Sequence, residues 1–316
     1  MLDLLVIGDA NPDVLISGAP DAAPAGQAET LVESGVLALG GSAAIMAHGA
    51  ARLGLATGFR SMVGRDEAGD LVLDLLSTAG VDISGCVRHE SLPTGLTVCL
   101  NRQDGDRAIL TSPGCLKEFG PEHVGEIEAR HVHSSGYFLL PRWENELAAC
   151  FRAARAAGSS TSLDTNDDPS GRWRLGPGLL DECTFVLPNA AEAVALTGVP
   201  GDALPAMLSA LAGPGRTPVV KCGDRGSVAL HEGVSITALP PRMTPLDTVG
   251  AGDSFDAGFL AGWLDSGDLG DALRLASACG ALSTQGAGGT AAQPDLPTAR
   301  HLATLVSVSS TALQRP

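Results

Sequence analysis

The sequence has 316 residues, a net charge of −16 and an aromatic content of only 3%. This length buries a substantial core without disulfides or structural metals, and the acidic, aromatic-poor composition disfavours a nucleic-acid partner. We expect a cytoplasmic protein without a membrane partner, because its seven cysteines form no C-x-x-C pair and it shows neither a basic signal region nor a membrane-length apolar run.

Short β-prone segments alternate along the chain with alanine- and leucine-rich segments of helical periodicity. Strands are predicted at residues 2–8, 132–140, 159–164, 184–188 and 218–223, and the helices include 42–54 and 68–80. Repeated strand-helix-strand units are typical of a mostly parallel sheet between two helical layers. We therefore expect one α/β domain that spans residues 1–316.

Two segments interrupt this alternation. Residues 13–39 are rich in small and polar residues before an apolar run, and residues 94–112 read as a hairpin with a turn at 103–106. We expect these two insertions to meet as a small β-sheet over one edge of the main domain.

The segment DTVGAGDSFDAGF, residues 247–259, combines bare backbone with an acid. Gly250, Ala251 and Gly252 precede Asp253, which falls in the first turn of an amphipathic helix. Helix N-terminal amides without side chains around them form a cradle for an anion such as phosphate. A carboxylate beside that anion can take the proton from a phosphoryl acceptor. The alternative interpretation is that Asp253 only caps the helix while the glycines pack against a neighbour.

This segment, extended to DTVGAGDSFDAGFLAGWL, resembles the C-terminal signature of the ribokinase-like (PfkB) carbohydrate kinase family. The run GGSAAIMAHGAARLG followed by VGRDEAGD resembles the N-terminal signature of the same family. The resemblance covers nearly the whole chain. It implies a three-layer α/β/α fold with a small β-sheet lid, ATP-dependent phosphorylation of a sugar, and a homodimer formed through the lid.

The resemblance also implies roles for the residues of the phosphoryl-transfer site. Asp253 would be the catalytic base, and the amides of Gly250–Gly252 would form the anion hole. Asn189 and Glu192 match the N-x-x-E pair of the family, which acts on Mg²⁺ and phosphate through water. Mg²⁺ prefers oxygen ligands and keeps several waters, so this role is physically reasonable. The alternative is a turn asparagine and a solvent-facing helical glutamate.

Further positions are implied to contact ATP or a cation. The segment VVKCGDRGSVAL and the later loop ALSTQGAGGT resemble the nucleotide-binding parts of the family. The residues matched there are Lys221, Gly223, Asp224, Gly226 and Gly286. Asp247 and the carbonyl of Val249 fall where some members bind a monovalent cation such as K⁺, and the alternative is a plain turn aspartate.

The substrate side of the resemblance lies in the turn GDANPD and in the glycine pair that follows the first insertion. Asn11 and Asp13 carry the amide and carboxylate groups that bind hydroxyls, although an Asx-turn beside Pro12 is the alternative. The remaining implied contacts are the backbone of Gly40 and Gly41 and, at the following helix start, Ser42, which would also be the N-cap. Ile45 departs from the family, which usually has asparagine there.

The distribution of basic residues bears on the substrate class. The first 51 residues contain no Lys or Arg, and we expect only Arg102 and Arg107 to reach the substrate turns. A sugar-phosphate kinase needs such residues, so the sequence favours a neutral sugar or polyol. A nucleoside is the first alternative, since Ile45 would suit an apolar wall, and a sugar phosphate is the less favoured one.

Motifs of other enzyme classes are missing from the sequence. The turn after the first strand lacks G-x-G-x-x-G, and no G-x-x-x-x-G-K-[ST] run is present. His131 and His133 alternate along a predicted strand without a partner motif, so they are interpreted as structural.

Overall fold

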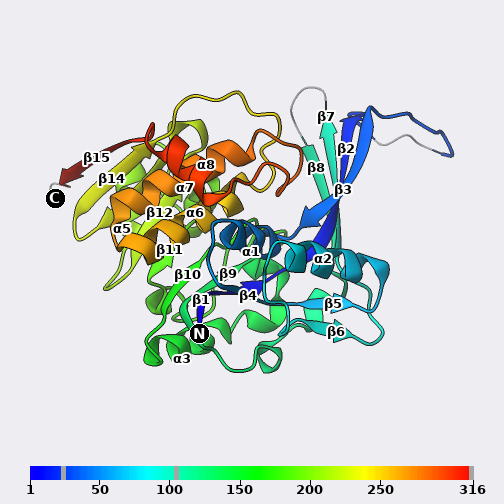
Figure 1. Cartoon of the computed structure of the whole chain (residues 1–316), viewed down its shortest axis with the longest axis horizontal. Coiled ribbons are helices and arrows are strands. Elements are labelled where there is room, and N and C mark those ends of the chain that lie inside the picture. The colour runs from blue at the N-terminus through cyan, green and yellow to red at the C-terminus, as the bar shows by residue number, and fades with distance from the viewer. Residues whose placement is uncertain (23–25, 103–106, 313–316) are drawn as a thin grey trace.

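The computed structural model describes residues 1–22, 26–102 and 107–312. The predicted hairpin turn at 103–106 lies outside the described residues. Within them, a nine-stranded sheet forms the centre of the molecule (Figure 1), in the order β15-β14-β13-β12-β11-β10-β9-β1-β4. Its strands are β1 (Leu2–Gly8), β4 (Thr57–Arg60), β9 (Ala129–Ser135), β10 (Ser160–Leu163), β11 (Phe185–Val186), β12 (Thr217–Lys221), β13 (Ser227–His231), β14 (Val234–Leu239) and β15 (Ser307–Ala312).

The pairing from β4 through β12 is parallel, and the remaining three strands extend the sheet in antiparallel fashion. Helices cover both faces of this sheet. They are α1 (Ser42–Arg52), α2 (Glu67–Thr78), α3 (Leu147–Ala156), α4 (Ala190–Thr197), α5 (Leu204–Leu211), α6 (Ala251–Ser266), α7 (Leu269–Ser283) and α8 (Leu296–Ala303). Short 3-10 segments are η1 (Gly114–Glu118), η2 (Pro121–His123), η3 (Tyr137–Leu139), η4 (Pro141–Trp143), η5 (Leu180–Glu182) and η6 (Gly223–Arg225).

Strand β1 shows why the domain has three layers. Its side chains alternate between the two faces, as the pleat requires. Leu4 and Val6 pack with α1, α2, α6 and α7, whereas Leu5 and Ile7 pack with η1, α3 and the neighbouring loops. Both faces of the strand are therefore buried, which explains the continuous apolar run in its sequence. The predicted α/β/α architecture is confirmed.

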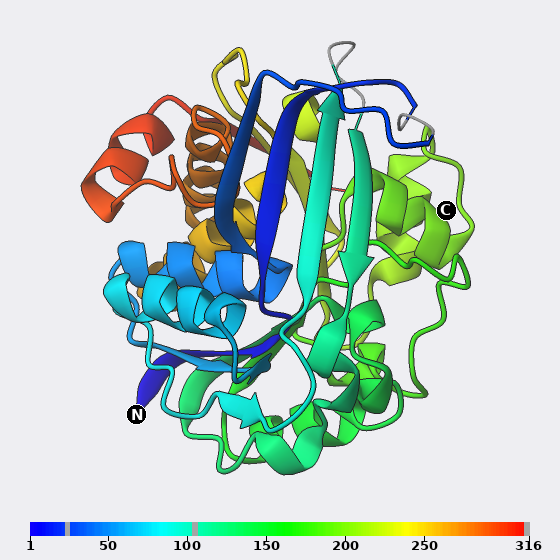
Figure 2. The same cartoon turned by 90° about the vertical axis from the view of Figure 1, so that its right-hand side faces the viewer.

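A second sheet stands over one end of the domain (Figure 2). It contains β2 (Asn11–Ala19), β3 (Ser34–Gly40), β7 (Leu96–Arg102) and β8 (Arg107–Ser112), in the order β3-β2-β7-β8. The two predicted insertions thus meet through parallel pairing of β2 with β7. Only Asp9 and Ala10 separate β1 from β2, so the chain passes directly from the large sheet into the small one. A further pair, β5 (Met62–Gly64) and β6 (Val87–His89), lies beside α2.

The strand predicted at 132–140 is too long at its C-terminal end. Strand β9 ends at Ser135, and Gly136 adopts a left-handed conformation with φ of 69° before η3 begins. A Cβ at this position would lie 2.4 Å from Oδ1 of Asp9. The chain therefore turns at a glycine, because a side chain at this position would clash with the Asp9 carboxylate.

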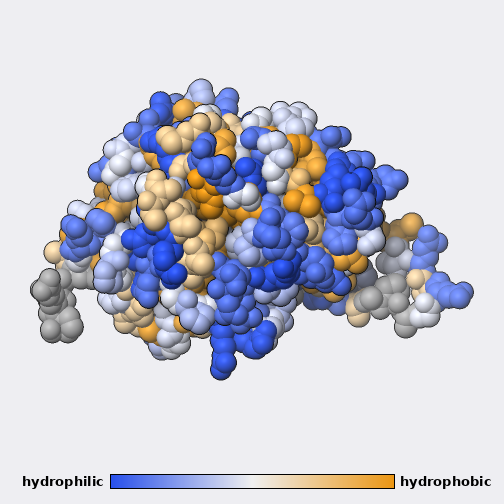
Figure 3. Space-filling model, turned by 90° about the horizontal axis from the view of Figure 1, so that it is seen from below, coloured by the Kyte–Doolittle hydropathy of each residue, from blue (hydrophilic) through white to orange (hydrophobic). Residues whose placement is uncertain are grey.

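Further features of the described residues concern the helices, the surface and the two histidines of β9. Among the described helices, none has both the length and the apolar character that crossing a bilayer requires. Figure 3 shows one face of the molecule on which hydrophobic residues form patches between hydrophilic ones. His131 and His133 are buried in β9, where all four ring nitrogens contact serine hydroxyls at 2.6–2.7 Å.

Candidate active site

One cavity of about 1170 Å³ lies between the carboxyl ends of the central strands and the small sheet. This is where open α/β sheets bind ligands. Most of the site residues predicted from the sequence line it, namely Asn11, Asp13, Gly41, Ser42, Asn189, Glu192, Lys221, Gly223, Val249, Gly250, Gly252 and Asp253. Those outside its lining are Gly40, Asp224, Gly226, Asp247, Ala251 and Gly286. Segments far apart in the sequence thus converge on one space.

The N-terminus of α6 forms the floor of this cavity. Gly250 is the N-cap in a left-handed conformation with φ of 71°, and a Cβ there would lie 2.5 Å from the Cα of Gly289. The Ala251 N–H donates to the carbonyl of Thr248 at 3.3 Å. The N–H groups of Gly250 and Gly252 have no partner among the described residues. Two of the three predicted anion-hole amides are therefore available to a ligand.

Asp253 lies in the first turn of α6 and is only 7% exposed. Burial raises its pKa well above the ordinary value, Asp164 raises it further, and Lys221 opposes both. A carboxylate with a raised pKa is a stronger base, which suits the removal of a proton from an alcohol.

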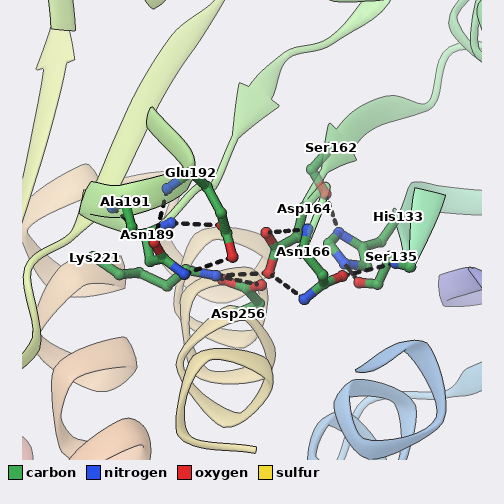
Figure 4. Close-up of polar contacts among 11 residues, drawn as sticks. His133, Ser135, Ser162, Asp164, Asn166, Asn189, Ala191, Glu192, Lys221 and Asp256 are labelled. Atoms are coloured by element: carbon green, nitrogen blue, oxygen red, sulfur yellow. Dashed lines mark hydrogen bonds and ion pairs between the residues drawn. The ribbon is translucent and has the colours of Figure 1, made fainter. Parts of the chain in front are cut away.

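A buried ion triad connects the ends of β12 and β10 with α6 (Figure 4). Nζ of Lys221, at the end of β12, is 2.7 Å from Oδ2 of Asp164 and 3.1 Å from Oδ2 of Asp256. Burial alone would lower the pKa of Lys221, but Asp164 and then Asp256 raise it, so the ammonium stays charged. A Cβ on Gly252 would be 3.5 Å from Nζ. The two aspartates therefore hold the Lys221 ammonium beside the proposed anion hole.

Asn189 and Glu192 form a capping box at the start of α4. Oδ1 of Asn189 accepts from the Glu192 N–H at 3.0 Å, and the Asn189 N–H donates to Oε2 of Glu192 at 2.8 Å. Glu192 is buried and lines the cavity, so it is not the solvent-facing glutamate of the alternative interpretation. Burial, and then Asp164, raise the pKa of Glu192 to about 7.

These two residues fit a hydrated Mg²⁺. Among the described residues, no group of three or more His, Cys, Asp or Glu side chains could hold a metal ion. Mg²⁺ needs no such group, because it binds one or two protein oxygens together with water and substrate phosphates. A buried carboxylate whose pKa is raised would be stabilised in its ionised form by a nearby divalent cation.

Asp247 joins two loops beneath the cavity. Its Oδ1 accepts from the Val249 N–H at 3.0 Å, and its Oδ2 accepts from the Gly288 N–H at 2.8 Å. These contacts connect the segment before α6 with the loop before α8. The plain turn interpretation therefore accounts for both oxygens, and the monovalent-cation site stays a prediction.

The acceptor turn is organised by Asp9, which the sequence analysis did not select. Its two carboxylate oxygens accept from the Ser42 N–H at 3.1 Å and the Ala43 N–H at 3.0 Å. The prediction that Ser42 is the N-cap of α1 was wrong, because Gly41 occupies that position and Asp9 supplies the capping oxygens. The signal in the sequence was an acid directly after a buried strand.

Asn11 and Asp13 point toward each other at the start of β2. Nδ2 of Asn11 donates to Oδ1 of Asp13 at 2.9 Å and to Oγ1 of Thr97 at 3.1 Å. A Cβ on Gly40 would lie 1.8 Å from the same Asp13 oxygen. Gly40 therefore makes room for Asp13, which explains why it does not line the cavity itself.

Ile45 lines the cavity from α1 and packs under the anion-hole loops. A Cβ on Gly289 would lie 2.5 Å from Cδ1 of Ile45, and one on Gly250 would lie 3.1 Å from its Cγ2. Ile45, which replaces the usual asparagine of the family, thus packs against the backbone of Gly250 and Gly289.

The expectation that only Arg102 and Arg107 could reach the substrate was wrong. Arg107 lines the cavity and Arg102 does not, while Lys117, Arg172 and Arg174 also contribute to its wall. These three residues lie outside residues 1–51 and 94–112, the two segments from which the charge of the substrate was predicted.

We expect the difference in stability between an Asp13→Asn variant and the natural protein to depend on pH. Burial, and then Asp9, raise the pKa of Asp13 from 3.8 to about 7 in the folded state. A raised carboxyl pKa favours folding below pH 4, and this contribution is lost as pH rises to about 7. At pH 8 the variant should therefore be more stable than the natural protein by roughly 2–4 kcal/mol.

Urea denaturation over a pH series measures this difference in unfolding free energy. Asp74→Asn, which removes an exposed carboxylate on α2, is the matched control. If the difference in unfolding free energy between Asp13→Asn and the natural protein does not shrink toward pH 4, the raised pKa of Asp13 is contradicted.

Comparisons with known proteins agree with this geometry. The model of the pfkB family carbohydrate kinases matches residues 1–296. A protein of Halopiger xanaduensis named ATP-dependent ribose-1-phosphate kinase is 32% identical over 97% of this chain and 99% of its own. Arabidopsis thaliana ribokinase is 28% identical over 92% of this chain and 78% of its own.

Solved structures show the same fold. Arabidopsis thaliana ribokinase complexed with ribose and ATP matches with a TM-score of 0.80 and 25% identity, covering 96% of this chain and 98% of that one. A putative ribokinase II of E. coli in complex with ATP and Mg²⁺ matches with a TM-score of 0.82 and 22% identity, covering 96% and 99%.

A three-layer α/β/α domain, a small sheet over its strand ends and a buried carboxylate beside helix amides define a ribokinase-like phosphotransferase. The chain belongs to the pfkB family of carbohydrate kinases. The expectation of an ATP-dependent carbohydrate kinase is thereby confirmed.

Proposed function

We propose that this protein transfers the γ-phosphate of MgATP to a hydroxyl of a small sugar, with Asp253 as the catalytic base. One observation carries the proposal. The buried carboxylate of Asp253 shares a cavity with the amides at the α6 N-terminus and with the polar side chains of Asn11 and Asp13. Asn11 and Asp13 bind the acceptor hydroxyls, Asp253 takes the proton from one of them, and the Gly250–Gly252 amides stabilise the charge on the migrating phosphoryl group.

The nucleotide side of the same cavity is formed by the ends of β11 and β12. Asn189 and Glu192 would hold Mg²⁺ through water, and the ion would supply positive charge to the phosphates of the nucleotide. Lys221 and Gly223 line the cavity there, and the turn from η6 to β13 extends the nucleotide site. The further residues assigned to this site are Asp224, Gly226 and Gly286. Asp247 and the Val249 carbonyl would hold a monovalent cation such as K⁺.

The acceptor is a small sugar, for which the sequence favours a neutral compound. The Arabidopsis ribokinase structure contains ribose and ATP, which supports a free sugar. The name of the Halopiger relative supports a sugar 1-phosphate instead. Ile45, Cys99 and Ile109 give the cavity an apolar wall, which keeps a nucleoside as a further alternative.

A panel of acceptors tests this function directly. We expect the purified protein with MgATP to release ADP only when a sugar acceptor is present, and we expect chelation of Mg²⁺ to stop the release. Coupled detection of ADP gives the rate, and mass spectrometry of the product identifies the phosphorylated compound. A nucleoside as the best acceptor would favour the alternative, and acceptor-independent ADP release would contradict the proposal.

The small sheet supports the predicted homodimer. Val36, Leu37, Leu96 and Leu110 are large apolar side chains that this sheet leaves exposed in the single chain. Burial of such a surface in a second copy would stabilise a dimer. The molar mass in solution tests this proposal, and a monomer at micromolar concentration would exclude it. The cytoplasmic location stays a prediction.

A further inference from the structure

Four cationic side chains line the cavity away from the nucleotide side. Arg107 is on β8, Lys117 is on η1, and Arg172 and Arg174 are on the loop that follows β10. Three segments that are distant in the sequence therefore bring positive charge to one space. Among the residues that the structure describes, none of these four groups has a carboxylate partner.

Many arginines of this acidic chain pair with carboxylates, whereas these four cationic groups do not. The net charge is −16, and examples of paired arginines are Arg65 with Glu90 at 2.7 Å and Arg300 with Asp265 at 2.8 Å. Glu144, Asp167 and Asp168 line the same cavity, but none of them forms an ion pair with these four groups, which are therefore available to an anionic ligand. Arginine is also well suited to bind phosphate and carboxylate groups through parallel hydrogen bonds.

The loop that carries the two arginines is held in place by Asp168. Its Oδ1 accepts from the Ser170 N–H at 2.8 Å, and its Oδ2 accepts from the Trp173 N–H at 2.7 Å. The Trp173 ring also packs edge-on against Phe138 at 5.5 Å between ring centroids. Arg172 and Arg174 therefore extend from a backbone that is ordered before any ligand binds, which lowers the entropic cost of binding.

Strand β8 connects the cationic group to the acceptor turn. Arg107, Ile109 and Thr111 alternate along this strand, and all three line the cavity. Oγ1 of Thr111 is 3.1 Å from Oγ1 of Thr97, which in turn accepts from Nδ2 of Asn11 at 3.1 Å. The strand that carries Arg107 is thus connected by hydrogen bonds to the acceptor turn, whereas Asn189 and Glu192 belong to the start of α4.

We propose that the acceptor of this kinase carries an anionic group, a phosphate ester or a carboxylate, bound by Arg107, Lys117, Arg172 and Arg174. This inference rests on the proposed function and replaces the neutral sugar that the sequence favoured. The hydroxyl to be phosphorylated then lies at Asp253 while the anionic group lies against β8 and the loop after β10.

Steady-state kinetics with matched acceptors test the inference. The acceptors are ribose, ribose 1-phosphate and gluconate, and the variants are Lys117→Met and the double variant Arg172→Ala/Arg174→Ala. We expect kcat/KM for an anionic acceptor to exceed that for ribose and to fall by about 10- to 100-fold in the double variant, because charge-assisted hydrogen bonds are lost. The loss in kcat/KM should be smaller for ribose, which lacks the anionic group. Arg300→Ala, which removes an exposed arginine on α8, is the control.

The two anionic acceptors distinguish the sources of the charge. A preference for ribose 1-phosphate assigns a phosphate site, and a preference for gluconate assigns a carboxylate site. Equal use of ribose and both anionic acceptors, or an equal loss for all three in the double variant, would overturn the inference.

Binding measurements separate this inference from the catalytic proposal. Calorimetric titration of ribose 1-phosphate, gluconate and ribose into an Asp253→Asn variant requires no turnover. We expect at least one anionic compound to bind about tenfold or more tightly than ribose, and we expect added salt to weaken only that binding. Equal affinities overturn the anion site whether or not the protein is a kinase, whereas tight anion binding without any phosphoryl transfer overturns only the proposed function.

Discussion

Replacement of Asp253 by asparagine is expected to lower kcat by about 10²- to 10⁴-fold, the range that a positioned general base contributes. Asparagine has the same shape but cannot take the proton from the acceptor hydroxyl. The amides at the start of α6 and the residues that bind both substrates remain, so the dissociation constants of ATP and acceptor should change little. Single-turnover kinetics together with calorimetric titration separate the chemical step from binding.

The matched control is Asp265→Asn, which removes an exposed carboxylate near the other end of the same helix. Unfolding of Asp253→Asn is not expected, because burial raises the pKa of Asp253 and a neutral side chain is the less costly one to bury. A variant that retained the natural kcat would show that Asp253 is not the catalytic base.

Replacement of Lys221 by methionine is expected to lower the free energy of unfolding by roughly 3–5 kcal/mol, the cost of leaving buried charges without their partner. Asp164 and Asp256 would lose the only cation within 4 Å that the structure describes for them. Turnover should fall as well, because the ammonium stands behind Gly252 at the proposed anion hole. Urea denaturation and kcat measure the two effects.

Arg300→Ala is the control for this experiment, since it removes an exposed cation on α8 that does not line the cavity. A triple variant that combines Lys221→Met with Asp164→Asn and Asp256→Asn should regain stability but not turnover. An unchanged urea midpoint for Lys221→Met alone would show that the triad contributes nothing to folding.

The architecture could be predicted because its signals are local. Residues 2–8 form a strand with the predicted bounds, and the two insertions supply all four strands of the small sheet. The end of β9 could not be predicted, since the turn at Gly136 depends on Asp9, which comes from a distant part of the sequence. Short-range patterns do not report such contacts between side chain and backbone.

The site residues that lie in short sequence motifs could be predicted. Asp253, Glu192 and Asp13 were selected from short segments, and the structure brings all three to one cavity. The pairing of Lys221 with Asp164 and Asp256 was not predictable, because it joins residues from two strands and a helix. Lys117, Arg172 and Arg174 could not be placed in the cavity for the same reason, so the prediction of a neutral sugar considered only residues 1–51, Arg102 and Arg107.

The two-residue connection between β1 and β2 has a consequence for substrate selection. Asp9 is anchored to the start of α1, and Asn11 and Asp13 follow it on β2 of the small sheet. Under the proposed function, a tilt of the small sheet would therefore move the acceptor-binding groups relative to Asp253. Binding of the acceptor and its alignment with the base would then occur in one step.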